Sequence, residues 1–245
     1  MLSKERIKLQ PAWILHRRDF RDSSQIVEVF SRDYGRVAMV ARGVKRPKSR
    51  HRGILQPFSA LRLSWVTGRD LGTLTDAEQI GQPLVLTGEA LMCGFYINEL
   101  LMKLTHRFDA IPSVFDGYAE TIQSLASDTA NAIALREFEW LFLREAGFGI
   151  ELAIDATSGQ PVDEERRYHV IVDEGPVLAE EAADMTTYSG ATLKAISVGD
   201  WTHPLTLRAA RRILGAAIDR QLDGKTLHTR RIIRELRQQS KSNEK

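Results

Sequence analysis

Short runs of alternating or β-branched residues mark the first third of the chain as strand-forming. Leu61, Leu63 and Trp65, for example, alternate with Arg62 and Ser64. The segments with this character are 11–18, 25–30, 36–42, 61–65 and 71–77. Because turn-forming residues separate such short strands, the pattern predicts a small β-barrel over residues 1–81.

After Gly81 the apolar residues follow the period of helices. The segments concerned are 84–108, 111–125, 130–146 and 205–222. Gly147 ends the third as a C-terminal cap. A last helix is expected to begin near Thr226 or Thr229, either of which would supply its N-cap. We therefore predict a helical domain in 82–150 that resumes as basic helices in 191–245.

Residues 151–190 form an acidic and irregular insert between these helices. Segments 168–172 and 177–179 flank Asp173-Glu174-Gly175-Pro176 and predict a short hairpin. The many carboxylates raise the question of a divalent-cation site, but the spacing of a calcium loop is absent and solvated surface is the stronger interpretation. With a barrel, helices and this insert, the fold class is α+β.

The densest charge lies between Arg32 and Arg52, where basic side chains greatly outnumber the single acid Asp33. Its first part is strand-like, and the periodicity stops after Gly43, which predicts a flexible cationic loop on a rigid scaffold. So many like charges repel one another, and this favours a polyanionic partner over a merely solvated loop. An oligonucleotide-binding (OB) fold and an SH3-like barrel both fit a small barrel with such a loop.

A site for single-stranded nucleic acid also uses aromatic rings on which bases stack. Phe20 and Tyr34 lie in polar turns and are the candidates. Trp65 shares a face with Leu61 and Leu63, so we expect it in the core.

The net charge of the 245 residues is only +2, because the basic ends, 1–52 and 208–245, flank the acidic segment 151–184. The sequence contains no phosphate-binding glycine loop, no nucleophile elbow and no paired histidines. Cys93, the only cysteine, lies in an apolar run with no neighbouring base. There is no secretory signal and no membrane-spanning segment. We therefore expect a cytoplasmic binding protein without catalytic residues, and not an enzyme.

Several segments occur in a fixed order along nearly the whole chain: Gly35-Arg36-Val37, Val40-Ala41-Arg42-Gly43, 53–58, 96–101, 135–139, 147–149, 207–212 and 224–227. In this order they resemble the RecO family, the bacterial recombination mediators of DNA repair. The resemblance implies an N-terminal OB-fold barrel, a helical domain and a zinc-ribbon-like insert. Many members hold zinc there with four cysteines, which this insert lacks, so we expect no zinc and no other cofactor.

The resemblance also implies an activity. Members of the family bind single- and double-stranded DNA without sequence specificity and anneal complementary strands. They engage the acidic C-terminal tail of the single-stranded DNA-binding protein SSB and, with RecR, help to load RecA. The implied location is the cytoplasm, in association with the nucleoid. Whether RecF is a partner stays open.

These implied roles map onto basic and apolar residues of the chain. The expected DNA-binding residues are Arg36, Arg42, Lys45, Arg46, Lys48, Arg50, Arg52, Phe20 and Tyr34. The expected site for the SSB tail pairs arginines with apolar side chains: Arg136, Leu135, Phe138, Leu207, Arg208, Arg211 and Arg212. A basic row near the C-terminus, Arg230, Arg234 and Arg237, would extend the DNA surface or have no role.

Three other functions stay open. An RNA-binding barrel protein of translation or ribosome assembly would prefer structured RNA to single-stranded DNA. A hydrolase or transferase would use carboxylates of the insert, such as Asp155, Asp163 and Glu164, to hold a metal. A structural adaptor would show no salt-sensitive binding of nucleic acid.

Overall fold

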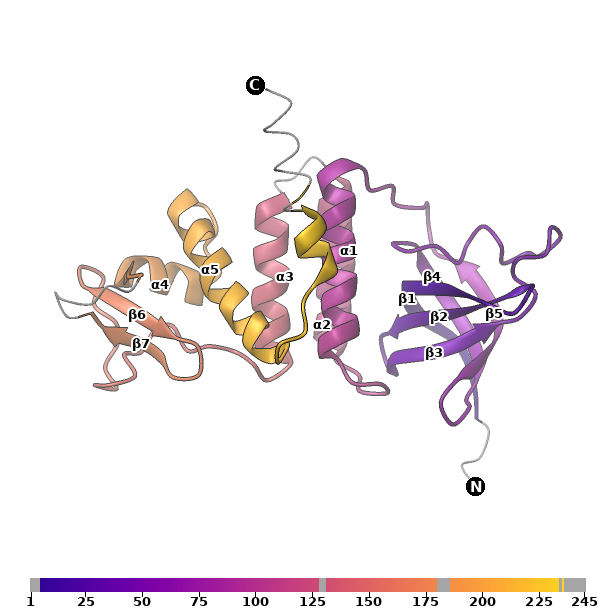
Figure 1. Ribbon diagram of the computed structural model, residues 1–245, viewed down its shortest axis with the longest axis horizontal. Helices are drawn as coiled ribbons and strands as arrows, with labels where there is room; N and C mark the ends of the chain where they lie inside the picture. Colours follow the sequence, from indigo (N-terminus) through magenta and orange to yellow (C-terminus); the bar gives the residue numbers. More distant parts are fainter. Residues whose placement is uncertain (1–4, 128–130, 180–185, 234, 236–245) are drawn as a thin grey trace. The chain divides into compact units, whose positions relative to one another are not determined.

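The computed structural model describes residues 5–127, 131–179, 186–233 and 235. The chain forms two compact units, Met1–Asp128 with Leu227–Lys245, and Thr129–Thr226. The first contains the barrel, two helices and the C-terminal segment, and the second contains the remaining helices and a small sheet (Figure 1).

The barrel of the first unit is closed, with the strand order β1-β2-β3-β5-β4 (Figure 1). Its strands are β1 (Arg6–Phe20), β2 (Ser24–Ser31), β3 (Gly35–Ala41), β4 (Ala60–Val66) and β5 (Gly72–Gln79). β1 pairs with both β2 and β4, and β3 runs parallel to β5. This is the arrangement of an OB fold, so the α+β class with an OB barrel is confirmed.

Apolar side chains from alternate positions of the strands fill the barrel. Val27, Val37, Met39 and Leu63 are among those that are almost wholly buried. Trp65, only 1% exposed, lies with them as the sequence predicted. The alternation arises because successive residues of a strand point to opposite faces, so every second side chain of β2 and β3 enters the barrel.

The outer face of β1 and β2 packs against α1 (Gly88–Leu104) and α2 (Pro112–Ala126). The ring of Trp13 meets Tyr118 edge-on at 5.4 Å, and Phe30 lies 5.6 Å from Phe115. Asn98 of α1 donates from its side-chain amide to the carbonyl oxygen of Leu15 at 2.9 Å. These helices therefore belong to the barrel's unit, although the composition of the chain changes from strand-forming to helical near residue 81.

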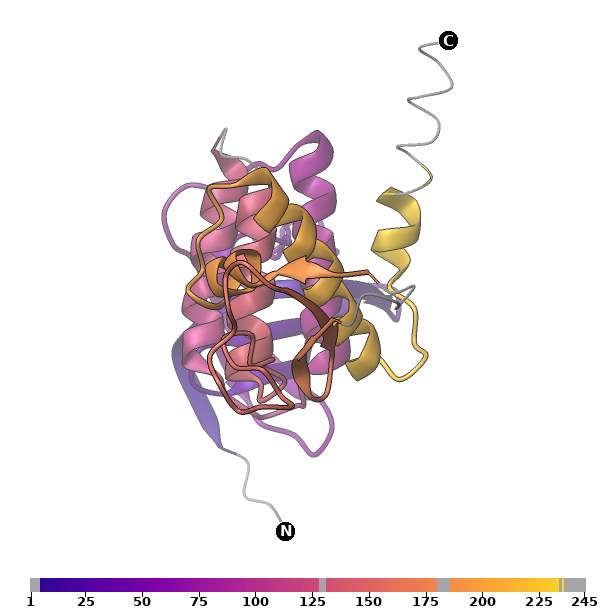
Figure 2. The same ribbon diagram turned by 90° about the vertical axis from the view of Figure 1, so that its left-hand side faces the viewer.

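The second unit contains α3 (Asn131–Glu145), α4 (Gly190–Ser197) and α5 (Pro204–Gln221), of which α5 packs against the other two. Its sheet has the order β7-β6-β8, with β6 (Arg167–Ile171), β7 (Gly175–Leu178) and β8 (Tyr188–Ser189) (Figure 2). The predicted hairpin is β6–β7. The sequence did not indicate β8 or α4, because elements of two and eight residues offer too few periodic positions.

A side-chain-capped turn opens the insert of this second unit. The buried carboxylate of Asp155 accepts hydrogen bonds from the backbone N–H groups of Thr157, at 2.8 Å, and Ser158, at 3.3 Å. Its own carbonyl oxygen accepts from the N–H of Gly159. An aspartate that bonds its own chain two and three residues on fixes a tight turn without any other ligand.

The C-terminal segment returns to the first unit, where a helix begins at His228. Thr229, one of the two predicted caps, lies within this helix. Instead, the carboxylate of Glu99 on α1 accepts the N–H groups of His228 and Thr229, both at 2.9 Å. Arg230 lies over the ring of Tyr96, 5.5 Å from its centre. Arg234 and Arg237 lie outside the described residues.

A substitution at Gly35 tests how the loop after α1 closes onto the barrel. Gly35 has a φ of +61°, and a side chain there would overlap the carbonyl oxygen of Asp109. We expect Gly35→Ala to lower the free energy of unfolding by about 3 kcal/mol or more, measured by urea denaturation. Gly81→Ala is the matched control, because Gly81 has a φ of +66° and open space around it. An equal, small loss in both variants would contradict the proposed overlap.

The Glu99 cap predicts a pH-dependent stability. Burial by itself would raise the pKa of Glu99, but the hydrogen bonds from Thr229 and His228 bring that pKa below its ordinary value. The stabilisation is therefore full above the ordinary glutamate pKa of about 4.3 and is lost as the pH falls through the lower pKa of the folded state. At pH 7, Glu99→Gln should cost about 1 kcal/mol of unfolding free energy in thermal denaturation. A difference from wild type that persists undiminished at pH 3 would refute the role of the ionised carboxylate.

Candidate nucleic-acid interface

The basic connection between β3 and β4, residues 42–59, lies beside the turn of the β1–β2 hairpin. The backbone N–H of Lys45 donates to the carbonyl oxygen of Ser23 at 3.0 Å, and its ammonium lies 2.8 Å from Asp19. Arg17 of β1 donates to the carbonyl oxygen of Leu55 at 3.4 Å. Cations from two separate stretches of sequence are thereby placed at one end of the barrel.

This connection, which the sequence predicted as a flexible loop, consists of a chain of turns. Backbone hydrogen bonds link Gly43 to Arg46, Arg46 to Ser49 and Ser49 to Arg52, each spanning three residues. Val44 and Leu55, 3% and 1% exposed, insert into the barrel core from either side of the basic run. The periodicity of a strand is lost there, but successive turns anchored by two buried side chains hold the charges in place.

Some cations of this connection form ion pairs and others do not. Lys45 pairs with Asp19, and Arg50 pairs with Asp76 at 2.9 Å. A hydrogen bond from the N–H of Ala77, with His51 and Arg50 nearby, holds the pKa of Asp76 below its ordinary value. The exposed cations of this connection without an ion pair in the described part of the chain are Arg42, Arg46, Lys48 and Arg52.

The β1–β2 hairpin adds three cations that sequence analysis did not single out. Arg17, Arg18 and Arg21 are all exposed. Their charge was visible in the sequence, but only the hairpin pairing places them beside the connection from β3. We call the combined set the basic surface: Arg17, Arg18, Arg21, Arg42, Lys45, Arg46, Lys48, Arg50 and Arg52.

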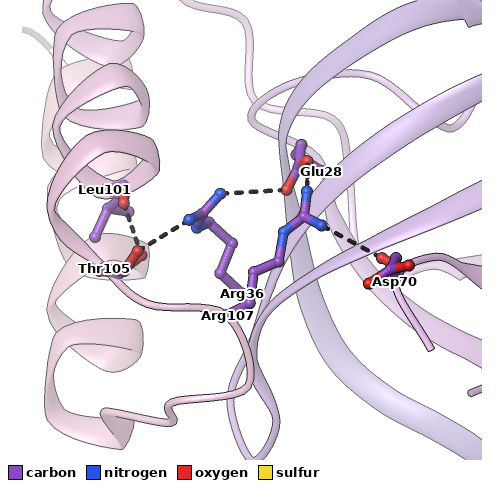
Figure 3. Close-up of polar contacts among 6 residues, drawn as sticks. All are labelled: Glu28, Arg36, Asp70, Leu101, Thr105 and Arg107. Carbon is purple, nitrogen blue, oxygen red and sulfur yellow. Dashed lines mark hydrogen bonds and ion pairs between the residues drawn. The ribbon is translucent and has the colours of Figure 1, made fainter. Parts of the chain in front are cut away.

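Arg36, expected among the DNA contacts, lies elsewhere and is engaged in the fold (Figure 3). Its guanidinium donates to the carbonyl oxygen of Thr105 at 3.0 Å and lies 3.5 Å from the carboxylate of Glu28. Glu28 also pairs with Arg107 at 2.6 Å, and Arg107 donates to the carbonyl oxygen of Asp70 (Figure 3). Arg36 is at the start of β3, whereas the basic surface follows its end.

Burial lowers the pKa of Arg36, and the neighbouring Arg107 acts in the same direction. Glu28 acts in the opposite direction on the pKa of Arg36, because its carboxylate pairs with both Arg36 and Arg107. The Glu28–Arg36–Arg107 cluster thus connects a barrel strand to the loop after α1. It is an internal tie of this unit, because little of Arg36 or Glu28 remains exposed to a ligand.

Neither predicted stacking residue presents a free ring. Tyr34 is half-buried against the barrel core and meets Trp65 edge-on at 5.4 Å. Phe20 is half-buried at the end of β1, with the guanidinium of Arg21 5.2 Å from its ring centre. Their turn positions suggested exposure, but packing on the core and on a neighbouring cation uses at least one side of each ring.

The expected site for an acidic tail divides into a buried and an exposed part in the second unit. Arg136 and Glu139 of α3 form a buried ion pair at 2.6 Å, and Phe138 is 1% exposed. Leu135 on α3 and Leu207 on α5 are half-buried. On α5, Arg208, Arg211 and Arg212 are exposed. The exposed arginines are therefore the part of this set that can meet a ligand.

Asp155, Asp163 and Glu164, the insert residues considered as metal ligands, have partners within the fold. Across the ranges that the structure describes, no cluster of His, Cys, Asp and Glu has the geometry of a metal site. Asp155 is used by its own turn, whereas Glu164 pairs with Lys194 at 3.0 Å and Asp163 with Arg166 at 3.7 Å. With no cysteine among these residues, zinc would lack the thiolates that structural sites use.

None of the helices in the described part of the chain has the length and apolarity that crossing a membrane requires.

Known proteins resemble this chain along nearly its full length. A family model described as Recombination protein O N terminal matches residues 6–83, and one described as Recombination protein O C terminal matches residues 86–231. The DNA repair protein RecO of Azoarcus sp. (strain BH72) is 43% identical over 241 residues, covering 96% of this chain and 99% of the relative. That of Aromatoleum aromaticum is 42% identical over 239 residues, covering 97% and 100%.

A third relative, the DNA repair protein RecO of Nitrosococcus oceani, is 40% identical and covers 95% of each chain. The two matching models meet between residues 83 and 86, directly after the barrel. Agreement across both the barrel and the helices that follow it indicates a common whole-chain architecture and not one shared domain. The chain belongs to the RecO family, and its role is in DNA repair and recombination.

Proposed function

We propose that this protein binds single- and double-stranded DNA through the basic surface and anneals complementary strands as a recombination mediator. The observation that carries this proposal is the gathering of nine cations from two stretches of sequence at one end of an OB barrel. Arg42, Arg46 and Arg52 stand exposed and without an ion pair among the described residues. Such a surface attracts phosphates of any sequence and releases their counterions, so binding is salt-dependent.

Annealing follows from the same electrostatics. Two complementary strands repel each other through their phosphates, and a dense cationic surface screens that repulsion and raises their local concentration. No covalent bond is made or broken, so the protein needs no catalytic residue. We place this activity in the cytoplasm, at the nucleoid.

The proposal includes an acidic tail of SSB as the second ligand. Exposed arginines Arg208, Arg211 and Arg212 of α5, beside the half-buried Leu207, offer charge together with apolar surface. A carboxylate-rich peptide with an apolar end suits this combination. We further propose that contact with RecR couples annealing to the loading of RecA. Phe138 and Arg136 support the fold of α3 instead of contacting the tail.

Annealing assays with two matched triple variants test the proposal. Replacing Arg42, Arg46 and Arg52 with Ala should weaken DNA binding about tenfold or more at moderate salt and reduce the slope of log affinity against log salt by about 2–3. Annealing of naked and of SSB-coated strands should both fail. Replacing Arg208, Arg211 and Arg212 with Ala should impair annealing of the coated strands only.

The control removes three exposed cations from other parts of the barrel, Arg6, Lys8 and Arg69, and should change little. Circular dichroism and thermal unfolding establish that each variant is folded. Equal losses of DNA binding in the Arg42, Arg46 and Arg52 variant and in this control would contradict a localised surface. If wild type binds structured RNA more tightly than single-stranded DNA at equal salt, the alternative of an RNA-binding protein of translation or ribosome assembly is favoured.

We also propose that the insert holds no zinc and is stabilised by its own hydrogen bonds. Treatment with a strong chelator should leave the thermal unfolding midpoint unchanged, whereas Asp155→Ala should lower the unfolding free energy by about 1–2 kcal/mol because two backbone N–H groups lose their acceptor. Asp155→Asn keeps the acceptor oxygen and should cost less. A chelator-induced drop in the midpoint, with metal found by elemental analysis, would overturn this proposal.

A further inference from the structure

The strand surface on which OB barrels bind oligonucleotides is covered in this protein, whereas the β1–β2 turn beside it carries the exposed Arg21 of the basic surface. That strand surface is the outer face of β2 and β3. Here the outward side chains of the strands are buried: Ile26 is 4% exposed, Phe30 0% and Ala38 1%. They are outside the barrel core, and the partners of Phe30 are Phe115 and Tyr118 of α2.

Hydrogen bonds add to the apolar packing of α1 and α2 on this face and make it specific. Tyr118 donates its hydroxyl to the side-chain oxygen of Asn98 at 2.7 Å, and Asn98 donates onward to the backbone of Leu15. At the start of β3, the guanidinium of Arg36 donates a hydrogen bond to the carbonyl oxygen of Thr105, the residue that follows α1 (Figure 3). Removing the helices would take the Asn98 amide away from the carbonyl oxygen of Leu15 and expose the rings of Trp13 and Phe30.

The aromatic side chains of the first unit all lie in its described part, so each can be assessed as a stacking platform. The deeply buried ones are Trp13, Phe30, Phe58, Trp65, Tyr96, Phe115 and Tyr118. Phe95 is 38% exposed, and its ring meets that of Phe58 edge-on at 5.2 Å. Phe108 is the most exposed, at 55%, but its N–H bonds Arg36 at the start of β3. The basic surface follows the other end of that strand, about 20 Å away.

We propose that the barrel recognises the phosphodiester backbone alone, with no contribution from base stacking. This inference rests on the proposed DNA-binding function and specifies its ligand as a chain of phosphates, with or without bases. Phe20 and Tyr34 are half-buried, and Arg21 and Trp65 each occupy one side of these rings, which leaves little ring surface for a base. The OB strands serve as a scaffold that docks α1 and α2 and positions the basic surface.

Bases that emerge unstacked from such a surface remain available for pairing. A protein that stacks bases on aromatic rings must release them before a second strand can pair, whereas phosphate contacts leave the base edges free. A backbone-only contact therefore suits an annealing protein in a way that the usual single-strand mode of an OB barrel does not.

The test compares two single strands of equal length, one with normal bases and one made of abasic tetrahydrofuran deoxyribose phosphates. We expect the full chain to bind both within about threefold of each other and with the same salt slope, because the phosphates are the ligand. Each stacked base would instead give the normal strand an advantage of about fivefold or more. A normal strand that binds about fivefold or more tighter than the abasic one overturns the inference.

Variants separate this inference from the proposed function. The Arg42, Arg46 and Arg52 triple variant should weaken binding of both strands by the same factor, whereas Phe20→Ala and Phe108→Ala should leave both affinities unchanged. A selective loss of the normal strand in Phe20→Ala would overturn the backbone-only mode and leave DNA binding intact. If neither strand binds to wild type, the proposed function itself has failed.

Discussion

The docking of α1 and α2 on the outer face of β1 and β2 is the interaction on which the first unit depends. Trp13 and Phe30 are buried between the barrel and the helices, each stabilising the fold by about 1.5–3 kcal/mol relative to exposure. The buried pair of Asn98 and Tyr118 fixes the register, because each polar group finds its partner in only one arrangement. The same packing decides which surfaces of the barrel remain available.

The helices cover one face of the barrel, and the chain concentrates its charge at one end of the barrel instead. The turns of 42–59 are anchored by Val44 and Leu55, so that cations which would repel one another in a free loop are held at fixed positions. Asp19 and Asp76 each engage one of them and leave others exposed. Part of the charge thus stabilises the fold, and the remainder is available to an external polyanion.

The second unit has both buried and exposed arginines. Arg136 forms a buried ion pair with Glu139 within α3, whereas Arg208, Arg211 and Arg212 of α5 are exposed to solvent. In the insert, the carboxylate of Asp155 accepts hydrogen bonds from the backbone N–H groups of Thr157 and Ser158. This turn is fixed locally, because the aspartate and its donors are within three residues of one another.

The sequence by itself determined the α+β class, the position of the strands, the principal helices and the burial of Trp65, because these follow from local periodicity. It also located the cations of 42–52. Only the tertiary structure decided which of them act together. Pairing across the β1–β2 hairpin brought Arg17, Arg18 and Arg21 into the basic surface, and contact with α1 removed Arg36 from it. The N-cap from Glu99 and the packing of Tyr34 likewise could not be predicted from the sequence, since each depends on residues that are distant along the chain.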